Sequence, residues 1–235
     1  METTQGGPFA ITPSPKIHRL CTLSLAAASL ALVPGISNAA AQAAPAGARL
    51  TFTKTLKGST PEYKSLSIDA AGRATYDSHK LGDPSNQRDL QISAATTAQI
   101  FSLASSLHNF HSLELNTHHK VANLGLKTFT YEDGTETNKV QFNFSENRTA
   151  QQLVDLFENI SNVEERIADL EYDMKYDHLD LPQALRQIQQ GMDDHLFAET
   201  GLMVPTLEKI SNDPRFMHLA QSRAQEIIER IHQGK

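Results

Sequence analysis

Apolar and polar positions alternate along residues 49–144, and this pattern predicts a sheet of short β-strands. Side chains two residues apart lie on the same side of a strand, so the apolar positions would share one buried face. Turn residues predict two hairpins, one through Asp69 and Gly72 and a two-residue one at Asp133-Gly134. The alternating apolar positions are Leu50, Phe52, Leu56, Leu66, Ile68, Ala74, Tyr76, Val140, Phe142 and Phe144.

Helical spacing replaces this alternation in two places, and these helices are expected to cover the sheet. Apolar residues recur at helical spacing over 100–107, and Ser93 is available as the N-cap of a helix of some fifteen residues. The capping box formed by Thr149 and Gln152 predicts the start of a second helix. Its apolar side would consist of Leu153, Phe157 and Ile160.

No strand pattern continues after Ser161, and the rest of the chain is predicted to be helical. A further capping box at Ser161 predicts a new helix with an apolar stripe and a solvated acidic face. Asp180 with Pro182 predicts the next helix start, and Asp213-Pro214 predicts that of the last helix. The stripe after Ser161 contains Val163, Ile167, Leu170 and Met174, its solvated face contains Glu164, Glu165, Asp169, Glu171 and Asp173, and the last helix would bury Phe216, Ala220, Ala224, Ile227 and Ile231.

These patterns together predict an α+β protein. Residues 44–160 would form an antiparallel sheet built from hairpins, with one or two covering helices. Residues 161–235 would form an acidic all-helical hairpin or small bundle, either packed on the sheet domain or extending from it.

The first 43 residues have the order of a secretory signal peptide. Basic Lys16 and Arg19 precede the apolar run 20–33, and small residues predict cleavage after Ala41 or Ala43. The apolar run is shorter than the roughly 20 residues that a membrane-spanning helix needs, so cleavage is favoured over a retained anchor. The mature protein is therefore expected in the periplasm or outside the cell, without stable membrane insertion.

Cleavage changes the chemistry that remains available. The chain's one cysteine, Cys21, would be removed, which excludes a disulfide, a thiolate nucleophile and a cysteine-based zinc site. The formal net charge of the whole chain is −6, and its excess acidity lies in residues 147–235, which contain sixteen acidic and nine basic side chains. A protein with this charge is not expected to bind nucleic acid or anionic lipid surfaces.

Residues 56–76 resemble a family of secreted bacterial domains of unknown function. That family has a Cys-x-Gly-x-Cys-Pro-x-Tyr motif followed by an Ile-Asp-x-x-Gly-x-x-x-Tyr hairpin, and the matching residues here are Gly58, Pro61, Tyr63, Ile68, Asp69, Gly72 and Tyr76. Leu56 and Thr60 stand where the family has its two cysteines, so a redox or disulfide role of that pair cannot operate in this chain. The resemblance implies a secreted sheet domain and no particular activity.

Four histidines close together in the sequence are the candidate metal ligands. His108, His111, His118 and His119 lie within twelve positions, and imidazole is the commonest metal ligand where cysteine is lacking. The alternative is that they are solvated loop residues, since His118 and His119 are adjacent and only Glu114 offers a nearby carboxylate. No cofactor-binding motif is present, and no catalytic residue is identified.

Two acidic clusters and several strand aromatics are further candidates with simpler structural interpretations. Asp173, Asp177 and Asp180 with His178, and the run 193–195, lack the glycine and spacing of a calcium loop, which favours helix ends and solvated faces. Aromatic residues in strands favour core packing over a ligand-stacking platform. These aromatics are Tyr63, Tyr76, Phe129 and Tyr131.

The sequence therefore favours an exported, non-catalytic interaction or structural module over an enzyme. Its partner would be another exported protein or a second copy of the chain, with the helices of residues 161–235 as the interaction surface. The alternative function is a metal-binding protein or metal-dependent hydrolase that uses the histidine cluster.

Overall fold

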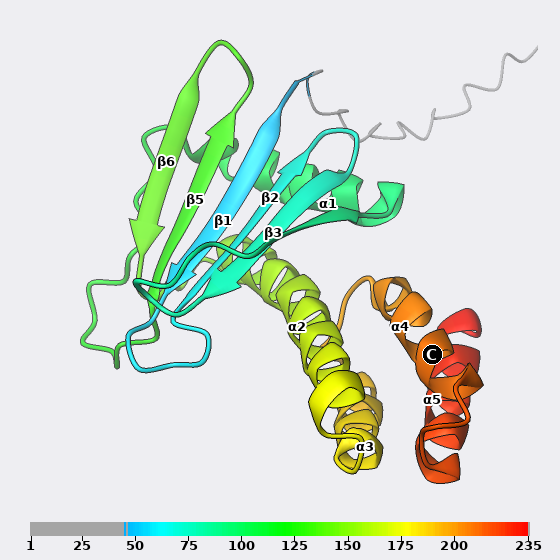
Figure 1. The fold of residues 1–235 in the computed structure, drawn as a ribbon. Helices are drawn as coiled ribbons and strands as arrows, with labels where there is room; N and C mark the ends of the chain where they lie inside the picture. The colour runs from blue at the N-terminus through cyan, green and yellow to red at the C-terminus, as the bar shows by residue number, and fades with distance from the viewer. Residues whose placement is uncertain (1–44, 46, 235) are drawn as a thin grey trace, which may run out of the picture. The chain divides into compact units, whose positions relative to one another are not determined.

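The structure, a computed structural model, describes residues 45 and 47–234, and these form an α+β fold with an antiparallel sheet and helices after it, as predicted (Figure 1). The predicted signal peptide, residues 1–43, lies outside the described residues. The elements in chain order are β1 (Arg49–Thr55), β2 (Tyr63–Asp69), β3 (Arg73–His79), β4 (Gln87–Gln91), α1 (Ala94–Ser106), the 3-10 turn η1 (His108–Phe110), β5 (Leu126–Glu132), β6 (Thr137–Phe142), α2 (Arg148–Tyr176), α3 (Leu181–Asp193), the 3-10 turn η2 (Thr200–Met203), α4 (Val204–Asn212) and α5 (His218–His232).

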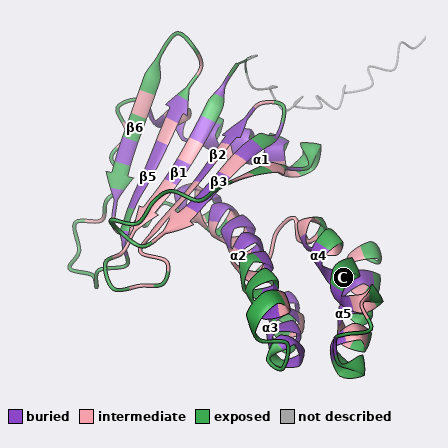
Figure 2. Cartoon of the chain, viewed as in Figure 1, coloured by how far each residue is buried: buried purple, intermediate pink, exposed green. Residues whose placement is uncertain are grey.

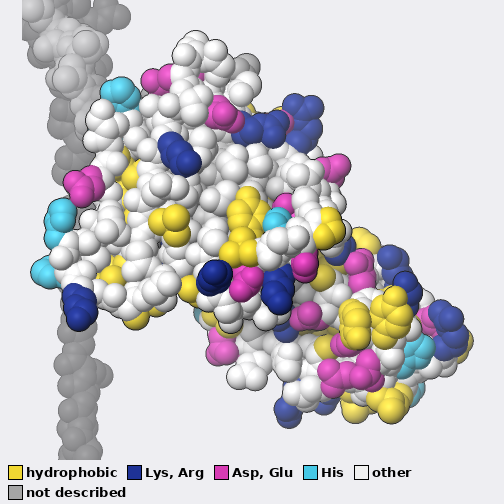
Figure 3. All heavy atoms as spheres, turned by 60° about the vertical axis from the view of Figure 1, so that its left-hand side comes forward, with side chains coloured by type: hydrophobic (Ala, Val, Ile, Leu, Met, Phe, Trp, Pro, Cys, Tyr) yellow, Lys and Arg dark blue, Asp and Glu magenta, His cyan; other side chains and the backbone are white. Residues whose placement is uncertain are grey.

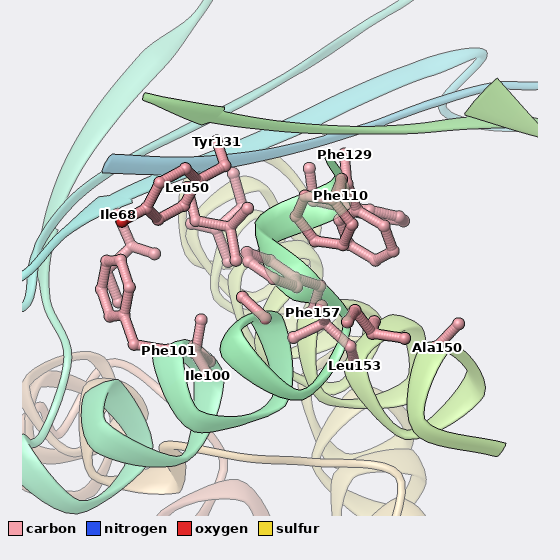
Figure 4. Packing of buried hydrophobic residues seen from close by; sticks show 14 of the residues in the cluster. Leu50, Ile68, Ile100, Phe101, Phe110, Phe129, Tyr131, Ala150, Leu153 and Phe157 are labelled. Carbon is pink, nitrogen blue, oxygen red and sulfur yellow. The ribbon is translucent and has the colours of Figure 1, made fainter. Parts of the chain in front are cut away.

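The six strands form one sheet in the order β4-β3-β2-β1-β5-β6, and every neighbouring pair is antiparallel. Buried apolar positions recur at every second residue on one face of the inner strands, and this face is covered by α1 and the first half of α2 (Figure 2). In its core, Phe129 stacks on Phe110 at 5.1 Å between ring centroids, and Phe157 of α2 lies beside both Phe52 and Phe129 (Figure 4). Tyr76, Phe129 and Tyr131 are buried, which confirms that they pack in the core.

Both predicted hairpins are present. At the first, the Asp69 carboxylate accepts the backbone N–H groups of Ala71 and Arg73, and Gly72 has φ +80°, the left-handed conformation that glycine adopts without strain. The second hairpin has a four-residue loop instead of the predicted two, because the Asp133 carboxylate accepts the N–H groups of Thr135 and Glu136 and widens the turn.

The predicted start of a new helix at Ser161 is wrong, because α2 continues without interruption for 29 residues. Ser161 does not cap a helix end: its hydroxyl donates to the Phe157 carbonyl one turn earlier in the same helix. The N-cap of α2 is Asn147, whose side chain accepts the N–H of Ala150, and not Thr149.

The last helix also starts later than predicted. Asp213 ends α4, and α5 begins at His218 after a turn in which the Phe216 N–H donates to the Asp213 carbonyl. The backbone N–H and the guanidinium of Arg215 both donate to the Asp213 carboxylate. The Asp213 side chain therefore does not cap α5.

A second hydrophobic cluster joins the C-terminal half of α2 to α3, α4 and α5. The buried side chains of α2 pass from the first cluster at Ile160 to the second at Val163, close to the predicted boundary between residues 160 and 161. The helical region also contacts the sheet layer directly, because Glu199 accepts both the N–H and the hydroxyl of Ser93 at the start of α1, and Leu202 packs against both clusters.

Replacing Phe157 with alanine is expected to lower the free energy of unfolding by about 3–5 kcal/mol, because the ring is fully buried between Phe52 and Phe129 and its removal leaves a cavity. Gln152→Ala on the exposed side of the same helix is the control and is expected to change it by less than about 0.5 kcal/mol. Urea unfolding of both variants measures this, and equal losses would contradict the assigned core.

Candidate functional site

The structure places the four candidate histidines on exposed positions after α1 and does not gather them into one site. His118 Nε2 lies 3.9 Å from Glu114 Oε1, whereas His119 Nε2 lies 3.6 Å from a different carboxylate, that of Glu146. Among residues 45 and 47–234, no three His, Cys, Asp or Glu side chains are placed to hold a metal ion. The metal hypothesis for His108, His111, His118 and His119 therefore has no converging ligand set in this part of the chain.

The acidic clusters are divided between solvent and core. The run 193–195 is exposed, and Asp193 pairs with Arg230 at 2.6 Å, which agrees with the prediction of a solvated helix end. Asp177, His178 and Asp180 are exposed as well. The prediction of a solvated face is wrong for Asp173 and Glu164 in α2, which are 8% and 1% exposed.

The core face of the sheet ends in a row of basic side chains that α2 neutralises. Lys54 of β1 and Lys64 of β2 lie directly opposite each other, and Glu158 bridges them, with Oε1 2.7 Å from Lys54 Nζ and Oε2 3.1 Å from Lys64 Nζ. Lys64 Nζ also lies 2.7 Å from Glu165 Oε1. Burial lowers the pKa of Lys64 less than the two carboxylates raise it, and the pKa of Glu158 is lowered because the two ammonium groups outweigh its burial.

Arg88 of the edge strand β4 extends this row and explains the burial of Glu164. Its guanidinium donates to both carboxylate oxygens of Glu171 at 3.0 and 3.1 Å, and its Nε lies 3.3 Å from Glu164 Oε2. That oxygen has no hydrogen-bond partner among the described residues, and burial raises the pKa of the Glu164 carboxyl in spite of Arg88. We call Lys54, Lys64, Arg88, Glu158, Glu164, Glu165 and Glu171 the strand–helix ion-pair network.

The stripe of α2 that forms these ion pairs continues into two exposed tyrosines. Glu158, Glu165 and Tyr172 follow one another at seven-residue spacing, which places them on one side of the helix. Tyr172 and Tyr176 lie beyond Glu171, the last α2 residue that pairs with the sheet, and are 61% and 64% exposed. Their ring centroids are 5.0 Å apart, so they form one aromatic surface, which we call the tyrosine pair.

Three aspartates lie near the tyrosine pair in the sequence, and Lys175 lies against the Tyr176 ring. Asp169, Asp173 and Asp177 lie within a turn of it along the chain, and Figure 3 shows hydrophobic and acidic side chains next to one another on the helical region. Within the described part of the chain, no basic side chain forms an ion pair with Asp173, Asp177 or Asp180. Burial raises the pKa of the Asp173 carboxyl, and so do the negative charges of Asp180 and Asp169.

An oriented imidazole on the open face of the sheet is a feature that the sequence analysis missed. The Asp77 carboxylate accepts the Ser85 hydroxyl and the Asn86 N–H, and lies 3.3 Å from His79 Nδ1. His79 also contacts the Tyr63 ring and lines a cavity of about 400 Å³ beside the loop between β1 and β2. The i, i+2 spacing of Asp77 and His79 in a strand could have indicated this pair.

The His79 arrangement lacks the second group that nucleophilic catalysis needs. An imidazole fixed by a carboxylate can act as a general base, but it must reach a nucleophile. The nearby Ser59 hydroxyl is within hydrogen-bond distance of the Leu56 and Pro61 carbonyls, and no hydrogen bond joins it to His79. The geometry therefore does not assemble an activated serine.

Lys127 is a buried basic side chain whose hydrogen bonds have a structural role. It borders a cavity of about 280 Å³ at the end of β5 and β6. Burial lowers the pKa of this amine, yet its ammonium form donates to the carbonyls of Leu124, Gly125 and Asn143. These bonds join the segments before β5 and after β6, so Lys127 holds two chain ends of the sheet together.

No helix in residues 45 and 47–234 is both long and apolar enough to cross a membrane. No family model matches the chain, and no curated protein matches it significantly. The resemblance of residues 56–76 to a secreted family stays a prediction, as do the signal peptide and the location that follows from it. The structure places Leu56 and Thr60 in the loop between β1 and β2.

Glu158→Gln is expected to lower the free energy of unfolding at pH 7 by about 1–3 kcal/mol, because it leaves Lys54 and Lys64 opposite each other without their shared carboxylate. The folded-state pKa of Glu158 is lowered, so its contribution is complete above its ordinary pKa of 4.5 and is lost as the pH falls through the folded value. Urea unfolding between pH 3 and 7, with exposed Glu114→Gln as control, measures this difference. A difference that does not shrink on acidification would contradict the role of the charge.

Zinc is expected to leave the melting temperature unchanged, because His118 and His119 face different carboxylates instead of sharing one site. Thermal unfolding with and without one equivalent of zinc, together with elemental analysis of the purified protein, measures this. A zinc-dependent rise that disappears in His111→Ala or His118→Ala would restore the histidine site.

Proposed function

We propose that this protein is a non-catalytic interaction module that binds a protein partner through the tyrosine pair at the end of α2. The observation that carries the proposal is the exposure of Tyr172 and Tyr176 side by side on one helix. Large aromatic side chains are the residues that most often supply binding energy at protein interfaces, since they bury much area at little cost in conformational entropy.

The position of the tyrosine pair on a rigid helix supports this proposal. The first half of α2 is fixed in the sheet core by Phe157 and Ile160, and the second half is fixed by Val163 and Leu170 against the other helices. A side chain on such a helix binds without a further loss of backbone entropy. Leu179 and Met217 are further exposed apolar side chains of the helical region, and each follows a residue of the contact between His178 and Phe216.

Site-specific photo-cross-linking in the producing cell is the test. A benzophenone amino acid at position 172 or 176 is expected to give a discrete cross-linked species, because both positions are exposed on the proposed surface. The same label at Leu81 or Leu126, which are exposed apolar positions of the sheet region, is the matched control and is expected to give none.

Surface labels are a sharper test than removal of residues 161–235, since that deletion would cut α2 in its middle. The proposal fails if no cross-link forms at 172 or 176, or if the control positions give the same species. A cross-linked dimer of the chain itself would assign the surface to self-association instead.

A further inference from the structure

We infer that the partner segment that docks on the tyrosine pair is basic, with arginine or lysine side chains placed against Asp173 and Asp177 and an apolar side chain against the rings. The inference rests on the proposed function and names the chemistry of its partner.

The first support is the uneven neutralisation of acidic charge along α2. Residues 164–180 contain seven acidic and two basic side chains. On the sheet side of the helix, Lys64 and Arg88 supply the opposite charge to the glutamates. Asp169 pairs with Arg166 at 3.0 Å, whereas past Glu171 no described basic side chain forms an ion pair with Asp173, Asp177 or Asp180. A surface of this sign attracts a positively charged partner and speeds its association.

The second support is the state of Asp173. Asp173 is 8% exposed as a residue, its carboxylate oxygens still reach solvent, and among the described residues the carboxylate forms no hydrogen bond or ion pair. A carboxylate that has little contact with water and no cation beside it is less stable in its charged form, and here the neighbouring charges are negative too. A cation that a partner places beside Asp173 would offset this repulsion only in the complex, and that gain favours binding.

The third support is that the ring faces accept a cation. The Lys175 ammonium lies 4.9 Å from the centroid of the Tyr176 ring, within the range of a cation–π contact. A guanidinium could stack on the neighbouring Tyr172 ring and pair with a carboxylate at the same time, which a flexible ammonium does less well. An arginine-containing segment therefore fits both components of the surface.

A second copy of the chain fits less well, although the rings alone would allow it. A two-fold dimer places the same patch against itself, so Asp169, Asp173 and Asp177 of one copy would face the same carboxylates of the other. Like charges brought together at an interface oppose association. Nucleic acid and anionic lipid are disfavoured for the same reason.

The inference is tested by calorimetric titration of residues 44–235 with two synthetic amphipathic peptides. The peptides have equal length and equal leucine content, and one has arginine and the other glutamate at its polar positions. The arginine peptide is expected to bind, to weaken as NaCl is raised from 50 to 300 mM, and to bind at least about tenfold more tightly than the glutamate peptide.

The variants separate the two components of the surface. Tyr172→Ser/Tyr176→Ser and Asp173→Asn/Asp177→Asn are each expected to weaken binding of the arginine peptide by about tenfold or more. Asp173→Asn alone is also expected to raise the melting temperature, because it removes a partly desolvated negative charge that lies near other negative charges. If Asp173 had only a structural role, its replacement would not weaken binding of the arginine peptide while raising the melting temperature.

Exposed Asp83→Asn and Leu126→Ser on the sheet region are the matched controls and are expected to bind as the unchanged protein does. Arginine-peptide binding that survives both double variants would overturn the inference as a general attraction to an acidic protein. Equal binding of both peptides, or cross-linking at Tyr172 without binding of either, would overturn the basic partner while the proposed docking function stands.

Discussion

The continuity of α2 is the constraint on which the rest of the described structure depends. Phe157 and Ile160 complete the core under the sheet, whereas Val163 and Ile167, less than two turns later, belong to the core of the C-terminal helices. A single helix can serve both cores only by turning a different side to each, and a regular α-helix does this when the apolar stripe shifts around its axis. Burial of apolar area on both sides then fixes the helix in place.

The polar side chains of α2 follow from the same geometry. The sheet ends in Lys54 and Lys64, which face each other across β1 and β2 and would repel without a shared carboxylate. Glu158 occupies that position, and Arg88 needs Glu171 and Glu164 in the same way at the sheet edge. The ion-pair network therefore sets the register of the helix on the sheet, while the apolar cores supply most of the stability.

Local patterns were sufficient for the positions of the hairpins and of α1, though not for the length of the second turn, since Gly72, Asp133 and Ser93 act on neighbours a few residues away. They were insufficient for α2, because the Ser161 hydroxyl donates to a carbonyl of its own helix. A serine in this pattern can therefore lie inside a helix as well as at its start. The burial of Glu164 depends on Arg88, which lies far from it in the sequence. The polar edge strand β4 was missed because its side chains show little apolar alternation.

The same distinction explains the candidate sites. Nearness of histidines in the sequence indicates a shared site only if the backbone folds them together, and the segment after α1 instead pairs His118 and His119 with separate carboxylates. No sequence pattern predicted the tyrosine pair, because an aromatic residue in a helix usually lies in a core. Tyr172 and Tyr176 are exposed because they lie on the part of α2 beyond the sheet.

Asp173 links these observations. Asparagine has nearly the same shape and would carry no charge into the crevice, so stability alone gives no reason for a carboxylate there. The network glutamates of the same helix differ, because each stands beside a cation that an uncharged side chain would leave unpaired. Asp173 therefore differs from the network glutamates in having no cation of the described chain beside it, and the proposed basic partner would supply one.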